Sequence, residues 1–207
     1  MLLLNLGCGK RIKPGYVNVD YDDTLPGIDE YVDLNQLPWP WDTGTVGQIM
    51  IANVAHELMP LGRPYGQLNQ AAVMQEIWRV LKPGGSLELI VPSTDGKGAF
   101  ADPMAVTFWN DMTLLCFLPG QHMDQGYPKF EIDARMGGVL VSQPDGLDQV
   151  WIVARLKKPG TEEIEDDGTS TGGECERGSE EGSGDGSIQD PAGESGQPEV
   201  REQPTDL

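Results

Sequence analysis

Short apolar runs separated by turn residues dominate the first half of the chain and predict the strands of a sheet. Residues 2–6 form an almost continuous run of leucines, as expected for a strand that is covered on both faces. Residues 16–20 alternate between apolar and polar positions and predict a second strand. Residues 29–34 and residues 48–53 predict a third and a fourth strand in the same way.

The connection between the first two predicted strands is unusually short. Parallel neighbours normally need a crossover of about a dozen residues or more, and that crossover is usually a helix. Here residues 10–15 follow the first glycines, and Pro14 and Gly15 among them form a turn signal. We therefore expect the first crossover to be reduced to a turn, with one face of the sheet thinly covered there.

Two helices are predicted in the middle of the chain. From Gln67 to Leu81 the apolar positions recur at steps of three and four residues, which indicates an amphipathic helix. The segment 82–85, Lys-Pro-Gly-Gly, ends this helix, and residues 86–91 predict a fifth strand. A second helix is predicted to begin at Pro103, because proline is favoured in a first helical turn and apolar positions follow it.

The remaining apolar segments complete the predicted fold. Residues 129–136 and 149–156 predict an antiparallel hairpin. Residues 37–41, Leu-Pro-Trp-Pro-Trp, predict an apolar loop, since two prolines exclude regular structure. The order of elements predicts an α/β, Rossmann-like fold: a mostly parallel twisted sheet with a C-terminal antiparallel hairpin and a shortened first crossover.

Composition divides the chain into a folded part and an acidic tail. Residues 159–207 are rich in Gly, Ser and Glu, lack aromatic residues, and hold 15 acidic residues against two arginines. Such a segment cannot bury enough apolar surface to offset its ordering entropy, so we expect it to be disordered. A folded segment long enough for one domain is left at residues 1–158. The tail is a solvated extension or a contact for a basic partner.

Charge and cysteine content exclude several classes of function. The whole chain carries a net charge of −19 and the tail −13, which leaves −6 on residues 1–158. This negative charge disfavours a nucleic-acid partner, because nucleic-acid binders usually present a basic face. Cys8, Cys116 and Cys175 are widely spaced, so neither a disulfide framework nor a metal site is indicated. The sequence contains no signal peptide and no run that could span a bilayer, and we expect an intracellular, cytoplasmic protein without a membrane partner.

The chemistry of the N-terminal block points to a nucleoside. Gly7 and Gly9 follow the first strand, and Asp20 ends the second. Glycines in such a turn let the backbone approach a ligand closely, and a carboxylate at the end of the next strand accepts hydrogen bonds from ribose hydroxyls. Ile12 stands where a dinucleotide fingerprint requires its third glycine, which argues against a nicotinamide dinucleotide.

These blocks together resemble the class I S-adenosylmethionine-dependent methyltransferases, and in particular the small type-11-like members of bacteria and phages. The resemblance lies in residues 4–20 (Leu-Asn-Leu-Gly-Cys-Gly-Lys-Arg to Val-Asp), 33–39, 76–85 (Glu-Ile-Trp-Arg-Val-Leu-Lys-Pro-Gly-Gly) and 102–109. It covers about residues 1–156 and implies methyl transfer from S-adenosylmethionine to an unidentified small-molecule or macromolecular acceptor.

The resemblance also implies a set of cofactor-binding positions. The glycine turn would pass beneath the methionine part of the cofactor, with Lys10 near its carboxylate, and the remaining positions would surround the ribose and adenine. The implied residues are Gly7, Cys8, Gly9, Lys10, Asp20, Asp33, Leu34, Asn53 and Val54.

Two departures from the family pattern leave alternatives open. His56 and Glu57 stand in reversed order after the fourth strand, and Met104 to Thr107 replace a polar cluster that relatives carry. His56 is the candidate catalytic base, with a locally hydrogen-bonded structural histidine as the alternative. Either the chain is an enzyme with in-line methyl transfer, or it is a methyltransferase-like binding module without catalysis.

Overall fold

The structure is a computed structural model that describes residues 1–60, 69–120 and 126–160. The residues from Met1 to Ile164 form one unit, which contains the whole of the sheet. The predicted tail lies outside the described residues from position 161 onward, so its disorder stays a prediction. Among the described residues, no helix is both long and apolar enough to cross a membrane.

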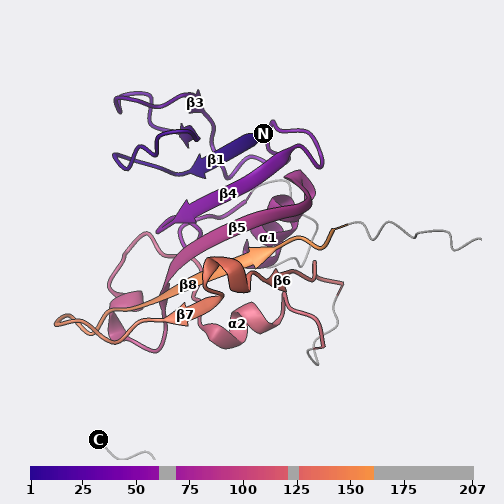
Figure 1. Cartoon of the computed structure of the whole chain (residues 1–207). Coiled ribbons are helices and arrows are strands. Elements are labelled where there is room, and N and C mark those ends of the chain that lie inside the picture. The colour runs from indigo at the N-terminus through magenta and orange to yellow at the C-terminus, as the bar shows by residue number, and fades with distance from the viewer. Residues whose placement is uncertain (61–68, 121–125, 161–207) are drawn as a thin grey trace, which may run out of the picture. The chain divides into compact units, whose positions relative to one another are not determined.

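The strands form a single mixed sheet with the order β3-β2-β1-β4-β5-β8-β6, while β7 pairs with β8 outside this path (Figure 1). The first five strands are parallel, and β8 runs antiparallel to β5, β6 and β7. This arrangement confirms the predicted mostly parallel sheet with an antiparallel C-terminal hairpin. The strands are β1 (Leu2–Leu6), β2 (Val17–Asp20), β3 (Glu30–Tyr31), β4 (Val46–Ala52), β5 (Leu81–Ser93), β6 (Glu131–Ile132), β7 (Val139–Val141) and β8 (Val150–Lys157).

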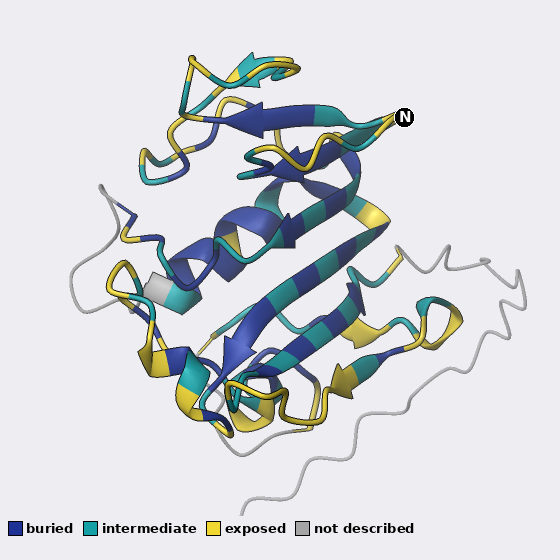
Figure 2. Cartoon of the chain, turned by 90° about the vertical axis from the view of Figure 1, so that its left-hand side faces the viewer, coloured by how far each residue is buried: buried dark blue, intermediate teal, exposed yellow. Residues whose placement is uncertain are grey.

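The two faces of the central sheet differ in how well they are covered. Helix α1 (Asn69–Val80) supplies Val73, Met74 and Ile77 to a core that β4 and β5 complete. Along β4, β5 and β8, buried positions alternate with half-buried ones, as the striped strands of Figure 2 show. Every second side chain therefore points to a face that is only partly covered, as the short first crossover predicts.

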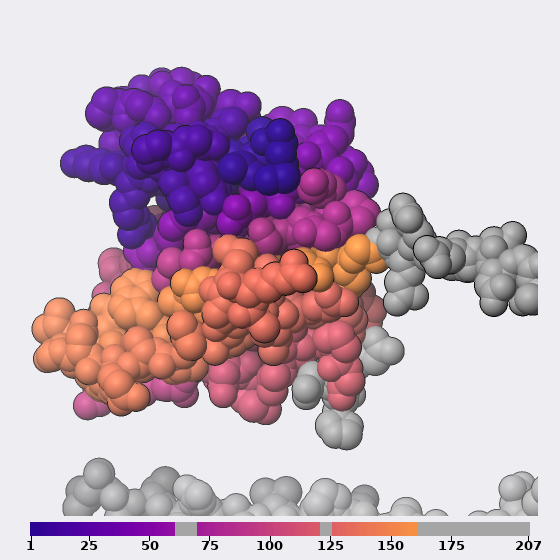
Figure 3. All heavy atoms as spheres, viewed as in Figure 1, coloured from indigo at the N-terminus to yellow at the C-terminus, as the bar shows by residue number. Residues whose placement is uncertain are grey.

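The partly covered face is polar at its centre. Glu88 on β5 forms ion pairs with Arg155 on β8, at 3.1 Å, and with Lys13, at 3.9 Å. Lys13 belongs to the first crossover, so this loop reaches over the face that a crossover helix would otherwise cover. In the space-filling view, the N-terminal residues form a continuous surface against the central strands (Figure 3).

Side chains of two buried asparagines hold the first crossover in place of a helix. Ten residues separate β1 from β2, and none of them is helical. Asn18 Oδ1 accepts hydrogen bonds from Asn5 Nδ2 at 2.9 Å and from the backbone N–H of Lys13 at 2.7 Å. Asn5 Nδ2 also donates to the carbonyl of Arg11 at 2.9 Å. The prediction of a crossover without a helix is confirmed.

The helix predicted from Pro103 is wrong over its first half. Residues 101–110 are irregular, and α2 spans only Asp111–Leu115, after the short 3₁₀ segment η1 (Lys97–Phe100). The backbone N–H groups of Val106 and Thr107 both donate to the carbonyl of His56, at 2.9 and 3.0 Å, and so cannot form helical hydrogen bonds. Asn110 starts the helix instead, as its N-cap in a capping box with Thr113.

Two predicted strands are shorter than expected. The segment 129–136 forms only β6 before the Asp133 side chain caps a 3₁₀ turn, η2 (Ala134–Met136), by accepting hydrogen bonds from Arg135 and Met136. The segment 29–34 pairs only over β3, because its flanking aspartates turn their carboxylates to backbone N–H groups: Asp29 to Asn18 and Asp33 to Asn35. The part of the predicted first helix before Asn69 lies outside the described residues.

Replacing Asn18 with alanine should destabilise the fold. The substitution leaves the Lys13 N–H without its acceptor and removes one of the two acceptors of the buried Asn5 amide. An unsatisfied buried polar group costs about 1–3 kcal/mol. We expect the free energy of unfolding, measured by urea titration, to fall by about 2–3 kcal/mol. The exposed Gln143→Ala variant serves as the control and should be unchanged. Equal stability of the Asn18 variant and the native chain would contradict a structural role for this network.

Candidate functional site

A pocket of about 330 Å³ opens at the carboxyl ends of the parallel strands. Ligands of open α/β sheets bind at this edge, because the loops that follow neighbouring strands meet there. The lining residues come from the segments after β1, β2, β3, β4 and β5: Gly7, Gly9, Asp20, Tyr21, Val32, Asp33, Leu34, Asn35, Val54, Glu57, Leu58 and Met104.

The glycine turn forms one wall of the pocket. Gly7 has a φ of +59° and Gly9 a φ of +52°, a conformation that residues with a side chain rarely adopt. A Cβ at Gly7 would stand 2.5 Å from Cγ2 of Val54, whereas a Cβ at Gly9 would meet nothing within 4 Å. Gly7 is therefore needed for close contact between the turn and the segment after β4, and Gly9 for the shape of the backbone.

Asp20 ties this turn to the end of β2. Its Oδ2 accepts the N–H of Gly9 at 2.8 Å, and its Oδ1 accepts the N–H of Asp22 at 3.1 Å. The residue is only 7% exposed, but it lines the pocket. Because an ionised carboxylate offers about four lone-pair positions, two remain available to a ligand.

The segment after β3 supplies the opposite rim. Asp33 lines the pocket and caps its own turn, since its Oδ1 accepts the N–H of Asn35 at 2.9 Å and its Oδ2 accepts from the Gln36 side chain at 3.3 Å. Leu34 is buried, and Val32 and Val54 add apolar surface. The charged lining residues are Asp20, Asp33 and Glu57, all acidic, so the described pocket is strongly electronegative.

Four of the predicted site residues do not line the pocket. Cys8 is buried behind the glycine turn, where burial first and the Asp20 charge second raise the pKa of its thiol, so it is no thiolate nucleophile. Lys10 is exposed beyond the turn. Asn53 adopts a φ of +59° at the end of β4 and donates its N–H to the carbonyl of Ile90.

The fourth, His56, lies buried behind the pocket wall. Its side chain contacts Asp102, with 3.2 Å between Nε2 and Oδ2, and Glu57, with 3.7 Å between Nε2 and Oε1. Burial raises the pKa of Glu57, while the backbone N–H of Met104 is the main cause of a lowered pKa at Asp102. Of these three residues only Glu57 lines the pocket.

Six lining residues were not predicted from the sequence. Tyr21, Val32, Asn35 and Leu58 follow or flank positions that were named, so their place after a strand end is a usable signal. Glu57 was noted only as the neighbour of His56. Met104 is named only as part of the segment 104–107 that departs from the family pattern, and the helix predicted there does not place it at the pocket.

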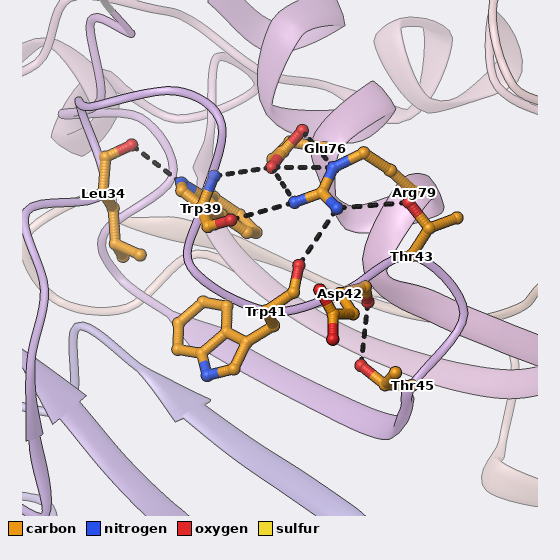
Figure 4. A network of polar contacts seen from close by, with 8 residues as sticks. All are labelled: Leu34, Trp39, Trp41, Asp42, Thr43, Thr45, Glu76 and Arg79. Carbon is orange, nitrogen blue, oxygen red and sulfur yellow. Dashed lines mark hydrogen bonds and ion pairs between the residues drawn. The ribbon is translucent and has the colours of Figure 1, made fainter.

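The apolar Pro-Trp loop is fixed to α1 by a partly buried ionic network (Figure 4). Glu76 accepts the N–H of Trp39 at 2.7 Å, and the Arg79 guanidinium donates to Glu76 and to the carbonyls of Trp39 and Trp41. Trp39 Nε1 in turn donates to the carbonyl of Leu34 at 3.0 Å. The network therefore positions the rim that Leu34 contributes.

Comparison with known proteins identifies the fold. No family model matches the chain, and no curated protein matches it. Among solved structures, the chain is similar to the 1,6-didemethyltoxoflavin-N1-methyltransferase of Burkholderia thailandensis, with 14% identity, a TM-score of 0.50, and coverage of 76% of this chain and 71% of that one. That structure contains 1,6-didemethyltoxoflavin and S-adenosylhomocysteine.

Two further solved structures are similar to the chain with lower TM-scores. A SAM-dependent methyltransferase of Thermotoga maritima is 13% identical over 76% of this chain and 82% of that one, with a TM-score of 0.49. A SAM-dependent methyltransferase of Archaeoglobus fulgidus is 13% identical over 75% and 85% of the two chains, with a TM-score of 0.45. The chain has the fold of the class I S-adenosylmethionine-dependent methyltransferases, as its resemblance to them predicts.

The Arg79→Lys variant tests the network behind the pocket rim. Lysine keeps the charge but cannot bond Glu76 and two carbonyls together, because it lacks the planar fork of the guanidinium. We expect the free energy of unfolding to fall by about 1–3 kcal/mol in urea titration. Arg135→Lys, at an exposed position, is the control and should leave stability unchanged. A fully stable Arg79→Lys protein would show that the loop is held by apolar packing alone.

Proposed function

We propose that the pocket binds S-adenosylmethionine and that the protein transfers the methyl group of this cofactor to an acceptor. The observation that carries the proposal is the contact between Gly9 and Asp20, which joins a left-handed glycine turn to a pocket-lining carboxylate at the end of β2. In a sheet of this class, this is the edge at which a nucleoside binds.

The charge of the pocket supports this cofactor. S-adenosylmethionine carries a sulfonium and an ammonium group, and the charged residues that line the pocket are Asp20, Asp33 and Glu57. Asp20 has lone pairs for the ribose hydroxyls, and Val32, Leu34 and Val54 offer apolar surface to the adenine. Phosphate-bearing cofactors are disfavoured, because their charge would face these carboxylates and no helix N-terminus follows β1.

The remaining predicted residues have proposed roles around the same pocket. Cys8 lets the turn close tightly on the Val19 carbonyl, to which its N–H donates at 3.0 Å. Asn53 and Val54 border the cofactor at the end of β4, with Asp33 at the adenine. Lys10 is the cation next to the turn and the proposed partner of the methionine carboxylate.

The reaction that fits this cofactor is an in-line displacement. A lone pair of the acceptor forms a bond to the methyl carbon while the carbon–sulfur bond breaks, and the bonding electrons remain on sulfur in S-adenosylhomocysteine. The protein contributes chiefly position and exclusion of water. A general base is needed only where the acceptor must lose a proton, and the predicted base His56 could act there only through Glu57, which lines the pocket.

Calorimetric titration with S-adenosylhomocysteine tests the cofactor. We expect binding in the micromolar range, about −8 kcal/mol, because the product shares the nucleoside and the amino acid of the cofactor. Asp20→Asn should weaken the affinity at least tenfold, or about 1.4 kcal/mol. Asp22→Asn is the matched control, since Asp22 stands two residues away and does not line the pocket. Absence of heat with the native chain would overturn the assignment.

Methyl transfer itself needs a separate assay with labelled cofactor. Nucleosides, sugars, small amines and phenols, and proteins should be offered in parallel, and we expect label to appear in one class of acceptor. Binding of S-adenosylhomocysteine without transfer to any acceptor would favour the alternative of a binding module without catalysis.

A further inference from the structure

His56, Glu57 and Asp102 form a compact cluster at the wall of the pocket, and of the three only Glu57 also takes part in the proposed cofactor site. One nitrogen and one carboxylate oxygen from each acid all lie within 4.8 Å of one another. The segment after β4 supplies His56 and Glu57, and the loop after β5 supplies Asp102. A histidine facing two carboxylates at this range is a set of metal ligands.

We propose that these three residues bind one divalent cation of the Zn²⁺ class. Zn²⁺ accepts imidazole nitrogen and carboxylate oxygen together, whereas Mg²⁺ prefers oxygen ligands alone. In a tetrahedral site with bonds of about 2.1 Å, neighbouring donor atoms stand about 3.4 Å apart. The distances from His56 Nε2 are 3.2 Å to Asp102 and 3.7 Å to Glu57, close to this value. All three ligand atoms lie within 4.8 Å of one another, so binding would draw the two carboxylates toward each other.

The backbone holds the two halves of the cluster together without any metal. The loop that carries Asp102 is attached to the carbonyl of His56 by three hydrogen bonds, from Val106 N, Thr107 N and Thr107 Oγ1. Asp102 Oδ1 is occupied by the N–H of Met104 at 2.8 Å. Its Oδ2 is therefore directed toward His56, and this half of the site is preorganised.

The ring presents a single nitrogen to the cluster. His56 is 2% exposed, and its polar contacts, to Asp102 and to Glu57, are both made by Nε2. Nε2 is therefore the nitrogen that would bind the ion. The two carboxylate side chains are about one-third exposed, at 34% and 31%, which leaves a path for an ion. A cation would also offset the repulsion between Glu57 and Asp102.

A cation in this cluster would lie beside the pocket. Three protein ligands leave a coordination position for water or for an oxygen of a bound molecule, as in catalytic rather than structural zinc sites. Glu57 is both a ligand and part of the pocket wall, and Met104, two residues from Asp102, also lines the pocket. The site therefore suits a pocket ligand that carries a hydroxyl or carboxylate oxygen.

Calorimetric titration of the full chain with ZnCl₂, without any nucleoside, tests the site. We expect one equivalent to bind tightly, and Asp102→Asn and Glu57→Gln each to weaken that binding at least tenfold. Asp111→Asn is the control, because it removes an exposed carboxylate outside the cluster. The cysteines and the acidic tail are the same in all variants, so any weaker Zn²⁺ binding by them contributes equally. Differences in affinity between variants therefore measure binding by the cluster.

Several outcomes would overturn the proposal. Equal affinity of the native chain and both cluster variants would place the ion elsewhere, and competition by MgCl₂ at equal concentration would exclude the Zn²⁺ class. If Asp102→Asn fails to fold, as judged by circular dichroism, Glu57→Gln at its partly exposed position still tests whether the cluster binds the ion. The separate titration with S-adenosylhomocysteine distinguishes a failure of this site from a failure of the cofactor pocket.

Discussion

Two parallel strands joined by ten residues must be kept in register without a crossover helix, and the rest of the site depends on how this is done. Asn18 accepts hydrogen bonds from the side chain of Asn5 and from the backbone N–H of Lys13. These bonds hold the loop against β1 and β2. The loop then leaves the glycine turn free to close on Asp20. The network adds to the parallel ladder between Leu4–Leu6 and Val17–Val19, and together they set the position of the turn that follows β1.

Different parts of the fold determine the charge of the pocket and the shape of its rim. Its carboxylates stand at strand ends, where the parallel topology brings them together. The position of its rim depends on α1. The Glu76–Arg79 pair on this helix holds the Trp39 loop, and Trp39 in turn binds the carbonyl of Leu34. A burial cost for this ion pair is offset by four hydrogen bonds to loop backbone and neighbouring groups.

The carbonyl of His56 connects the segment after β4 with the loop after β5. Because Val106 and Thr107 bind it, the Asp102 loop lies against the pocket wall rather than forming the first turns of a helix. The same attachment brings Asp102 to His56 and Met104 to the pocket. The hydrogen bonds to this one carbonyl therefore influence three features: the secondary structure of the loop, the pocket lining, and the cluster of His56, Glu57 and Asp102.

Local signals were sufficient for much of the fold and part of the site. The leucine run of β1, the spacing of apolar residues in α1, and the missing helix between β1 and β2 could be read from neighbouring residues, because the periodicity of a strand or helix is a local property. The glycine turn and Asp20 could be named because ligand positions follow strand ends, whereas Asp33, Leu34 and Val54 were implied by the resemblance to the family.

Only the tertiary structure decided the features that depend on distant partners. The segment after Pro103 has helical spacing, but its N–H groups bond to a carbonyl about fifty residues away, and β3 and β6 end where aspartate side chains capture backbone donors. The burial of His56, the exposure of Glu57 to the pocket, and the approach of Asp102 likewise result from chain packing. The spacing of residues in the sequence does not indicate such contacts, because they form between distant segments that the sheet brings together.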